Sequence, residues 1–310
     1  MTNTGGERQD IIGFEVPVVQ TPPNILTGMS AEFLSVVFPL IYLEPEYREY
    51  QGTAFCLGAI ASGQIIFATA KHVLEPAQEP LSKQPYVLIP HLTQNVPGRF
   101  LAMALPVDAA SVATTHNDTA LIRCDRRTSG AIELIELRSM RLKFVPAVEG
   151  TPTLAIGYAR HRITDDLDFT RDFRASHGIV EAIFNESSDF FFGNFPSFQT
   201  NSIYDPGMSG GPVFDRDGGC IGIVSRGSNT LEGVEPWAYA APVACLGELG
   251  MDLESDEGST RTWTFQEMIS GGMVNLEGEG GVTLTHDPDG LHLQFLSTDL
   301  IDGAPETDDS

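Results

Sequence analysis

The chain has 310 residues, 42% of them hydrophobic, which suits a folded protein of one large domain or two smaller ones. Its 42 acidic and 18 basic residues give a net charge of −24, so we expect neither a nucleic-acid partner nor binding to a membrane. No run approaches the roughly 20 apolar residues that span a bilayer. Met1–Asp10 does not resemble a signal peptide, so the predicted location is cytoplasmic.

Residues 1–30 are polar and rich in proline and glycine, which predicts an extended leader. From residue 31 to about 245, short apolar runs alternate with turns, which is the strand pattern of a barrel or a sandwich. The predicted strands are Phe33–Tyr42, Gly52–Ile60, Gln64–Thr69, Tyr86–Pro90, Ala120–Arg123, Thr153–Gly157, Gly178–Phe184, Gly211–Phe214 and Cys220–Ser225. The sequence DRDGG between the last two predicts a hairpin turn. Helical signal is limited to residues 129–138 and 240–250.

The last 60 residues differ from this body in charge. Residues 251–310 hold fourteen acidic residues and one basic residue, a net charge of −13, while residues 1–250 carry −11. Two alternating runs, Val282–Thr285 and Leu291–Phe295, flank the turn HDPDG and predict a β-hairpin. The end of the chain is predicted to be disordered. We therefore expect a leader at 1–30, a folded domain at 31–250 and an acidic extension at 251–310.

The cysteines argue against a metal or redox site. Cys56, Cys124, Cys220 and Cys245 form no CxxC pair, and each lies among apolar neighbours. They are predicted to be buried thiols in a reducing compartment. No HExxH spacing occurs, and HDPDG lacks the other ligands of a calcium loop. Neither a metal nor a cofactor is expected.

The strongest chemical signal is DPGMSGGPV, which runs from Asp205 to Val213. A serine hydroxyl is a weak nucleophile and must project from a tight turn toward a base. The turn must also direct main-chain N–H groups at one point, where the oxyanion of an acyl-transfer reaction forms. The glycines permit such a turn beside Ser209. On its own, however, a glycine-rich turn containing serine is equally well explained as a hairpin.

Two further signals lie at strand ends. His72 follows the apolar strand Gln64–Thr69 in the sequence TAKHV, and Asp118 leads into an apolar strand in NDTALI. Each has a structural alternative, since such a histidine is often only packed and such an aspartate often only caps a turn. His116 competes for the role of base, and Asp108 and Asp125 compete with Asp118, but none of these three has the same relation to a strand.

Together these motifs resemble the chymotrypsin-fold serine peptidases, specifically the Deg/HtrA type. That family carries its base in TAxH, its acid in DxAL and its nucleophile in GxSGGP, and the order His72, Asp118, Ser209 is the chymotrypsin order. The segments LAIGYAR, SHGIVEA and GGCIGIVSRG also resemble strands of this family and extend the likeness over roughly residues 31–245. The resemblance implies an all-β fold of two antiparallel six-stranded β-barrels, with a short C-terminal helix and an acidic tail.

The resemblance also implies roles for single residues. Ser209 would attack the scissile carbonyl, His72 would accept its proton, and Asp118 would orient the imidazole. The N–H groups of Gly207 and Ser209 would form the oxyanion hole. A protein or peptide substrate would be bound as an extended strand, by the main chain of Ser225, Arg226 and Gly227. An apolar side chain in the specificity pocket, that of Ile203, favours cleavage after small or apolar residues.

Several departures from the family bear on regulation. Met208 stands where digestive members have the aspartate that pairs with a new N-terminus, and Val73 stands where secreted members have a cysteine, which leaves Cys56 single. The extension does not resemble the PDZ domain that HtrA proteins append.

The function expected from the sequence is that of a serine endopeptidase. A regulatory protein partner bound through residues 251–310 is one expectation for the extension, as in a partner-controlled stress or defence effector. Two alternatives stand beside this function. One is a catalytically silent HtrA-like protein that binds peptides, and the other is a signalling scaffold that acts through its acidic tail.

Overall fold

A computed structural model gives the structure of the chain. It describes residues 11–15, 33, 35–43, 51–60, 62–75, 83–90, 99–113, 117–129, 136–163, 169–184, 196–227, 237–255, 258–277, 282–287 and 290–295. Both the competing histidine His116 and most of the helix predicted at 129–138 lie outside these ranges. Among the described residues, no helix has the length and apolar character needed to cross a membrane.

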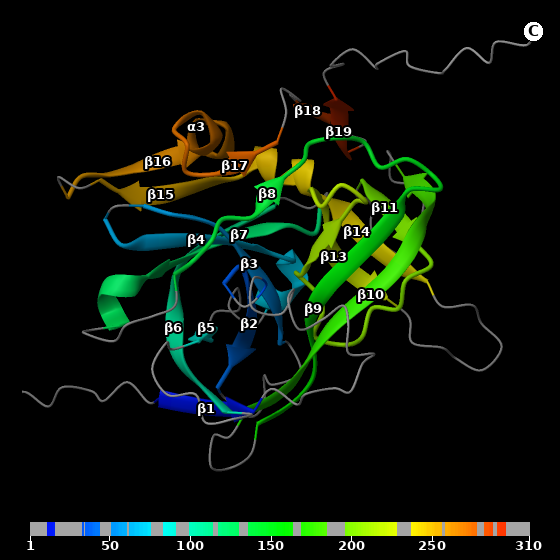
Figure 1. The fold of residues 1–310 in the computed structure, drawn as a ribbon. Helices are drawn as coiled ribbons and strands as arrows, with labels where there is room; N and C mark the ends of the chain where they lie inside the picture. Colours follow the sequence, from blue (N-terminus) through cyan, green and yellow to red (C-terminus); the bar gives the residue numbers. More distant parts are fainter. Residues whose placement is uncertain are drawn as a thin grey trace, which may run out of the picture.

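The first half of the chain forms a closed barrel of six antiparallel strands (Figure 1). Its strands follow the order β5-β2-β3-β4-β7-β6, and β5–β6 pairing closes the ring. They are β2 (Val37–Tyr42), β3 (Gly52–Ala59), β4 (Gln64–Thr69), β5 (Pro85–Pro90), β6 (Arg99–Val112) and β7 (Ala120–Asp125). Every residue of β2 and β4 is buried, so these strands read in the sequence as continuous apolar runs.

The second half forms a second closed barrel. Its strands follow the order β11-β14-β13-β12-β9-β10, and β10–β11 pairing closes it. They are β9 (Pro152–Ile163), β10 (Phe169–Phe184), β11 (Ser197–Thr200), β12 (Pro212–Phe214), β13 (Cys220–Gly227) and β14 (Ala238–Pro242). The predicted hairpin turn is present between β12 and β13, where Asp215 Oδ1 accepts hydrogen bonds from the N–H groups of Asp217 and Gly219.

A short strand near the N-terminus bridges the two barrels. β1 (Ile11–Glu15) pairs antiparallel with β6 of the first barrel and parallel with β10 of the second. Short 3₁₀ turns in the described part of the chain are η2 (Lys71–Leu74), η3 (Arg126–Ser129) and η4 (Val243–Glu248). The helical turn expected at 240–250 is therefore found, and the prediction of two antiparallel six-stranded barrels is confirmed.

The acidic extension begins with elements that pack on the first barrel. β15 (Gly250–Glu254) pairs with β16 (Thr260–Thr264), which leads into α3 (Phe265–Ser270). β17 (Asn275–Leu276) then pairs with β8 (Arg141–Leu142). Figure 1 shows β15, β16 and α3 lying along the first barrel. The expected hairpin follows, as β18 (Val282–Asp287) and β19 (Gly290–Phe295).

Apolar side chains of the extension belong to the large core cluster that contains the strands of the first barrel and some residues of the second. Met251, Leu253, Phe265, Met268 and Val274 are all at most 3% exposed and lie in the same core cluster as the strands β2 to β4. Gly250, the last residue of the domain expected at 31–250, is the first residue of β15. The buried residues after it were not expected, because acidic residues dominate the composition of the extension. In the described part of the chain, residues packed on this core cluster extend past Gly250 to Leu276.

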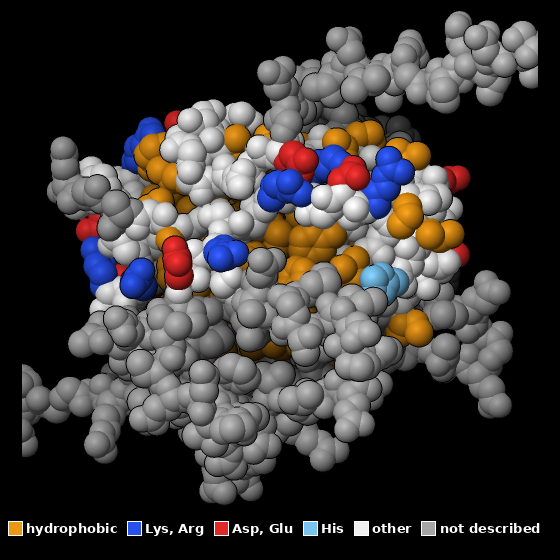
Figure 2. Space-filling model, viewed as in Figure 1, with side chains coloured by type: hydrophobic (Ala, Val, Ile, Leu, Met, Phe, Trp, Pro, Cys, Tyr) orange, Lys and Arg blue, Asp and Glu red, His pale blue; other side chains and the backbone are white. Residues whose placement is uncertain are grey.

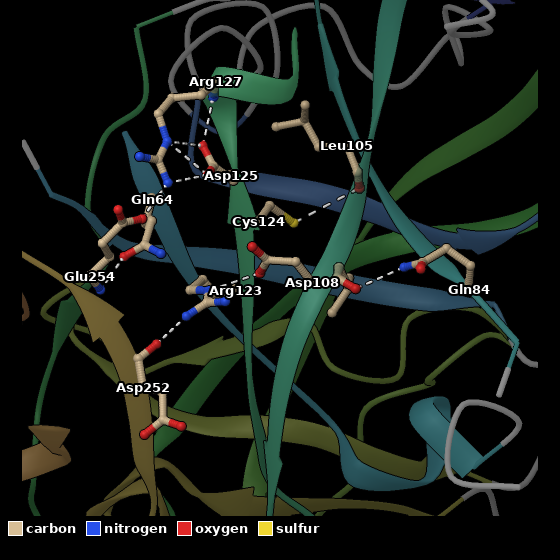
Figure 3. A network of polar contacts seen from close by, with 11 residues as sticks. Gln64, Gln84, Leu105, Asp108, Arg123, Cys124, Asp125, Arg127, Asp252 and Glu254 are labelled. Carbon is tan, nitrogen blue, oxygen red and sulfur yellow. Dashed lines mark hydrogen bonds and ion pairs between the residues drawn. The ribbon is translucent and has the colours of Figure 1, made fainter. Parts of the chain in front are cut away.

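Polar contacts fasten the extension to the same barrel (Figure 3). Arg123 on β7 donates both to the Asp108 carboxylate (2.9 Å) and to the main-chain carbonyl of Asp252. Arg127 pairs with Asp125 and with Glu254, at 2.6 Å in both cases. On the face that Figure 2 shows, basic and acidic side chains likewise lie next to each other in small groups. Much of the charge in the described residues is thus locally paired.

Candidate active site

His72 is held at the junction of the two barrels by the end of β4. Ala70 continues the extended backbone past Thr69, and η2 then turns the chain so that Val73 and Leu74 are buried. The Tyr42 hydroxyl donates to the Val73 carbonyl at 3.0 Å, which pins this turn. The His72 side chain, between these buried neighbours, remains 26% exposed. A barrel strand thus presents the imidazole at an accessible position.

The buried carboxylate of Asp118 contacts His72 with both oxygens. Oδ2 lies 2.8 Å from His72 Nδ1, and Oδ1 accepts a hydrogen bond of 3.0 Å from the His72 main-chain N–H. Burial by itself raises the pKa of Asp118, but the positive potential of His72 and the hydrogen bonds from His72 and Ser225 outweigh it and lower the pKa below its ordinary value. Asp118 is therefore an ionised acceptor that fixes the orientation of the imidazole.

Asn117 positions the loop that carries Asp118. Its side-chain carbonyl accepts the Thr119 N–H at 2.7 Å, which forms a tight turn ahead of β7. Its amide donates to the Cys245 carbonyl (3.4 Å) and to the Glu248 carboxylate on η4. The asparagine beside the predicted acid thus ties this loop to the 3₁₀ turn that follows the second barrel.

Ser225 connects Asp118 with Ser209. The Ser225 hydroxyl, fully buried at a bulge in β13, donates to Asp118 Oδ2. The Ser225 main-chain carbonyl accepts a hydrogen bond of 3.2 Å from Ser209 Oγ. The sequence assigned Ser225 only main-chain contacts with substrate. Its side-chain contact was not predicted, although a lone serine in an otherwise apolar, buried strand is a usable signal.

The loop around Ser209 is packed tightly between the barrels. Gly210 has φ +86°, and a Cβ there would lie 2.1 Å from the Thr53 carbonyl and 2.9 Å from Ala70 N. A Cβ on Gly52 would meet both Val73 and the Ser209 carbonyl. These close approaches bring the Ser209 loop against Ala70, which precedes η2, and against Val73, which follows His72 within it. Ser209 itself is half-buried.

Two main-chain donors in this loop remain unused. Gly207 has φ +97°, and neither its N–H nor that of Ser209 donates to any described residue. The intervening Met208 N–H instead bonds the Asp205 carbonyl at 3.0 Å. The loop therefore offers two free N–H groups next to the serine hydroxyl, which is the arrangement that an oxyanion requires.

The competing acids lie elsewhere. Asp108 pairs with Arg123, and Asp125 with Arg127, on the outside of the first barrel (Figure 3). The structure therefore brings His72 together with Asp118 rather than with either rival. No group of three or more His, Cys, Asp or Glu residues that could hold a metal occurs within the described ranges. The four cysteines are free and buried, as predicted.

The residues predicted to contact substrate lie in different surroundings. Arg226 and Gly227 are exposed at the end of β13, opposite Tyr239 and Ala238 of β14. Ile203 is 51% exposed, and its N–H bonds the Ser176 hydroxyl at 3.0 Å. Its side chain therefore lies at an open surface rather than in the buried floor of a pocket.

This geometry agrees with comparisons to known proteins. A family model described as a trypsin-like peptidase domain matches residues 52–223, which include His72, Asp118 and Ser209. The chain belongs to the trypsin-like peptidase family. It is 24% identical over 184 residues, 57% of its length, to a probable periplasmic serine endoprotease, DegP-like, of Halomonas elongata. That match spans 35% of the length of this relative.

Solved structures of similar proteins include Deg5 and the Rv3671c protease of M. tuberculosis in its active form. Deg5 is 17% identical with a TM-score of 0.47, covering 70% of this chain and 87% of its own. Rv3671c is 16% identical with a TM-score of 0.44, covering 79% of this chain and 91% of its own.

Replacing Ser225 tests the environment of Asp118 in this trypsin-like domain. A carboxylate with a lowered pKa stabilises the fold above its unfolded pKa of about 3.9, and this contribution is lost as pH falls through the folded pKa. Ser225→Ala removes one hydrogen bond that lowers the pKa of Asp118. We expect acid unfolding, followed by circular dichroism, to begin at a higher pH than in wild type. An unchanged midpoint would show that the hydroxyl does not stabilise the charge.

Proposed function

We propose that the chain is a serine endopeptidase that acts through Ser209, His72 and Asp118. The observation that carries this proposal is the two-point contact of the buried Asp118 carboxylate with His72. Because an ionised carboxylate only accepts hydrogen bonds, Nδ1 carries a proton and Nε2 is left as the basic nitrogen. Nε2 makes no hydrogen bond to any described residue and is therefore free to receive a proton.

The chemistry follows from these positions. Ser209 Oγ turns from the Ser225 carbonyl toward Nε2, transfers its proton to His72 and attacks the scissile carbonyl carbon. The carbonyl oxygen becomes an oxyanion that accepts from Gly207 N–H and Ser209 N–H. His72 then protonates the leaving amine, and an acyl-enzyme remains on Ser209. Water, deprotonated by His72, hydrolyses this ester and regenerates the serine.

The substrate in this proposal is an extended peptide that adds to the end of β13. β12 pairs with β13 only as far as Ile223, whereas β14 continues on the other edge to Gly227. Ser225 to Gly227 therefore have one edge without a strand partner among the described residues. A peptide strand fits there by main-chain pairing, with its scissile bond directed toward Ser209. The preference for small or apolar residues before that bond stays a prediction, because Ile203 lies at an open surface.

A fluorophosphonate probe tests this function directly, because it reacts with an activated serine. We expect labelling of the wild-type chain and none of Ser209→Ala, measured by intact-protein mass. Labelling of Ser209 together with cleavage of a peptide library would also report the preferred residue before the scissile bond. If folded wild type is not labelled, alone or with cell extract, the peptidase proposal fails. A protein that then still bound extended peptides would be the silent alternative.

The cytoplasmic location and a regulatory partner for the extension stay predictions. Four free, buried thiols agree with a reducing compartment. In residues 251–277, as far as the structure describes them, the apolar side chains are packed in the core, so a partner would contact their outer face.

A further inference from the structure

Thr53 is a buried polar residue for which the mechanism above has no role. It lies on β3 of the first barrel and is fully buried, where a polar side chain is costly unless it is hydrogen-bonded. Its hydroxyl donates to the Gly207 carbonyl (2.9 Å) and accepts from the Tyr158 N–H on β9 (2.9 Å). One side chain of the first barrel thus bonds both the nucleophile loop and a strand of the second barrel.

The main chain of Thr53 is engaged in the same region. Its N–H donates to the Ser209 carbonyl at 2.7 Å, and its carbonyl accepts from the Thr69 hydroxyl at 2.8 Å. The nucleophile loop is therefore held on both sides of Met208, through Gly207 by the hydroxyl and through Ser209 by the main chain. A Cβ on Gly157 would lie 2.9 Å from Met208 Cα and 3.0 Å from the Thr53 hydroxyl, so β9 packs directly against both.

The hydroxyl contact bears on the two free donors. The Gly207 carbonyl and the Met208 N–H belong to one planar peptide, so a hydrogen bond to that carbonyl fixes the plane. Gly207 has φ +97°, and fixing this plane limits the rotation about ψ that would turn the Gly207 N–H to another direction. Glycine has little intrinsic preference that would hold such a conformation without external bonds. Two hydrogen bonds hold this peptide, one within the loop from the Met208 N–H to the Asp205 carbonyl and one from outside the loop, donated by Thr53.

We propose that Thr53 is a positioning residue that holds the oxyanion hole in its reactive conformation through the Gly207 carbonyl. This proposal rests on the proposed peptidase function. Thr53 does not touch the substrate. A hydroxyl is needed because it must donate to Gly207 and accept from Tyr158 at once, which serine also does and valine does not.

Kinetics of Thr53→Val test the proposal, since valine keeps the shape and removes the hydroxyl. Removing an oxyanion donor itself lowers kcat by about 10²- to 10³-fold, so loss of its positioning is expected to lower kcat by about 10- to 100-fold. KM for a peptide substrate should change by less than about threefold, since β13 is untouched. Affinity for a peptide boronate, which forms a tetrahedral adduct, should fall with kcat, and Thr53→Ser should restore both.

Thr69→Val is the matched control, because it removes a fully buried threonine hydroxyl that packs against Gly210 and bonds the Thr53 carbonyl but donates no hydrogen bond to the nucleophile loop. Equal losses of kcat in Thr53→Val and Thr69→Val would overturn the proposal, as would a loss expressed only in KM.

Hydrogen exchange gives a readout that does not need catalysis. Amides of residues 203–211 should exchange faster in Thr53→Val than in wild type and Thr69→Val, while strands of the second barrel stay protected. If wild type proves inactive, the peptidase function fails but this measurement still decides the role of Thr53. Unchanged exchange in Thr53→Val would refute it.

Discussion

Asp118→Asn is expected to lower kcat by about 10⁴-fold while leaving the fold and peptide binding intact. Asparagine has nearly the shape of aspartate, but its amide nitrogen is a donor. Facing His72 with that donor favours the imidazole tautomer with the proton on Nε2, which then has no lone pair to accept the proton of Ser209. The same substitution removes the negative charge that stabilises the imidazolium formed during attack. Steady-state kinetics on a cleaved peptide measure the loss.

Asp108 and Asp125, the two acids that competed with Asp118, provide controls because the same change to asparagine can be made at each. Asp125→Asn weakens the ion pair with Arg127, and Asp108→Asn the one with Arg123, both on the outside of the first barrel. Their kcat values should stay within about twofold of wild type, because surface pairs contribute little and touch no reacting group. If either variant lost activity while Asp118→Asn kept it, the assignment of the acid would be wrong.

Short-range sequence patterns, taken together with the family resemblance, predicted these three residues. His72, Asp118 and Ser209 each lie next to a buried strand whose apolar run is visible in the sequence, so motif and strand reinforce each other. The side-chain roles of Ser225 and Thr53 were not predictable in this way. Their partners lie 107 and 154 residues away, across the junction of the barrels. A polar residue in an apolar strand can mark such a position, but no local pattern identifies its partner.

Among the strands of the fold, too, some were predicted from the sequence and others were not. Strands that are buried on both faces, such as β2 and β4, were recognised from continuous apolar runs. β6 was not, because its sequence RFLAMALPVDAASV mixes alanine, proline and aspartate and owes its extended form to pairing with β5 and β7. β15 and β16 were not predicted, because the many acidic residues of the extension indicated a solvent-exposed segment rather than buried strands.

A capped helix secures that extension. The Thr264 hydroxyl accepts the Glu267 N–H, and the Glu267 carboxylate accepts the Thr264 N–H at 2.8 Å. This main-chain hydrogen bond, with that of the Thr264 side chain, lowers the pKa of Glu267. The capping box begins α3 where Phe265 enters the core, and the Phe265 ring stacks on Phe144 with centroids 6.2 Å apart. Residues distant in the sequence thus share one core.

Phe265→Ala should therefore destabilise the whole first barrel. Replacing a fully buried phenylalanine by alanine costs about 3–5 kcal/mol, from lost burial and from the cavity that remains. We expect this decrease in the free energy of unfolding in urea, together with faster hydrogen exchange in β4. Gln266→Ala, at the exposed next position of α3, should change stability by less than about 0.5 kcal/mol.

The alternative is that residues 251–277 are an appendage that folds independently of the peptidase domain. Phe265→Ala would then speed exchange only within those residues and leave β4 protected. Truncation after Gly250 separates the two cases in the same way, because it would uncover Phe144 and its neighbours and is expected to yield an unstable domain. A stable, fully active truncated protein would show instead that the extension is dispensable for folding and catalysis. A role of the extension in binding a partner through its acidic outer face would then be favoured.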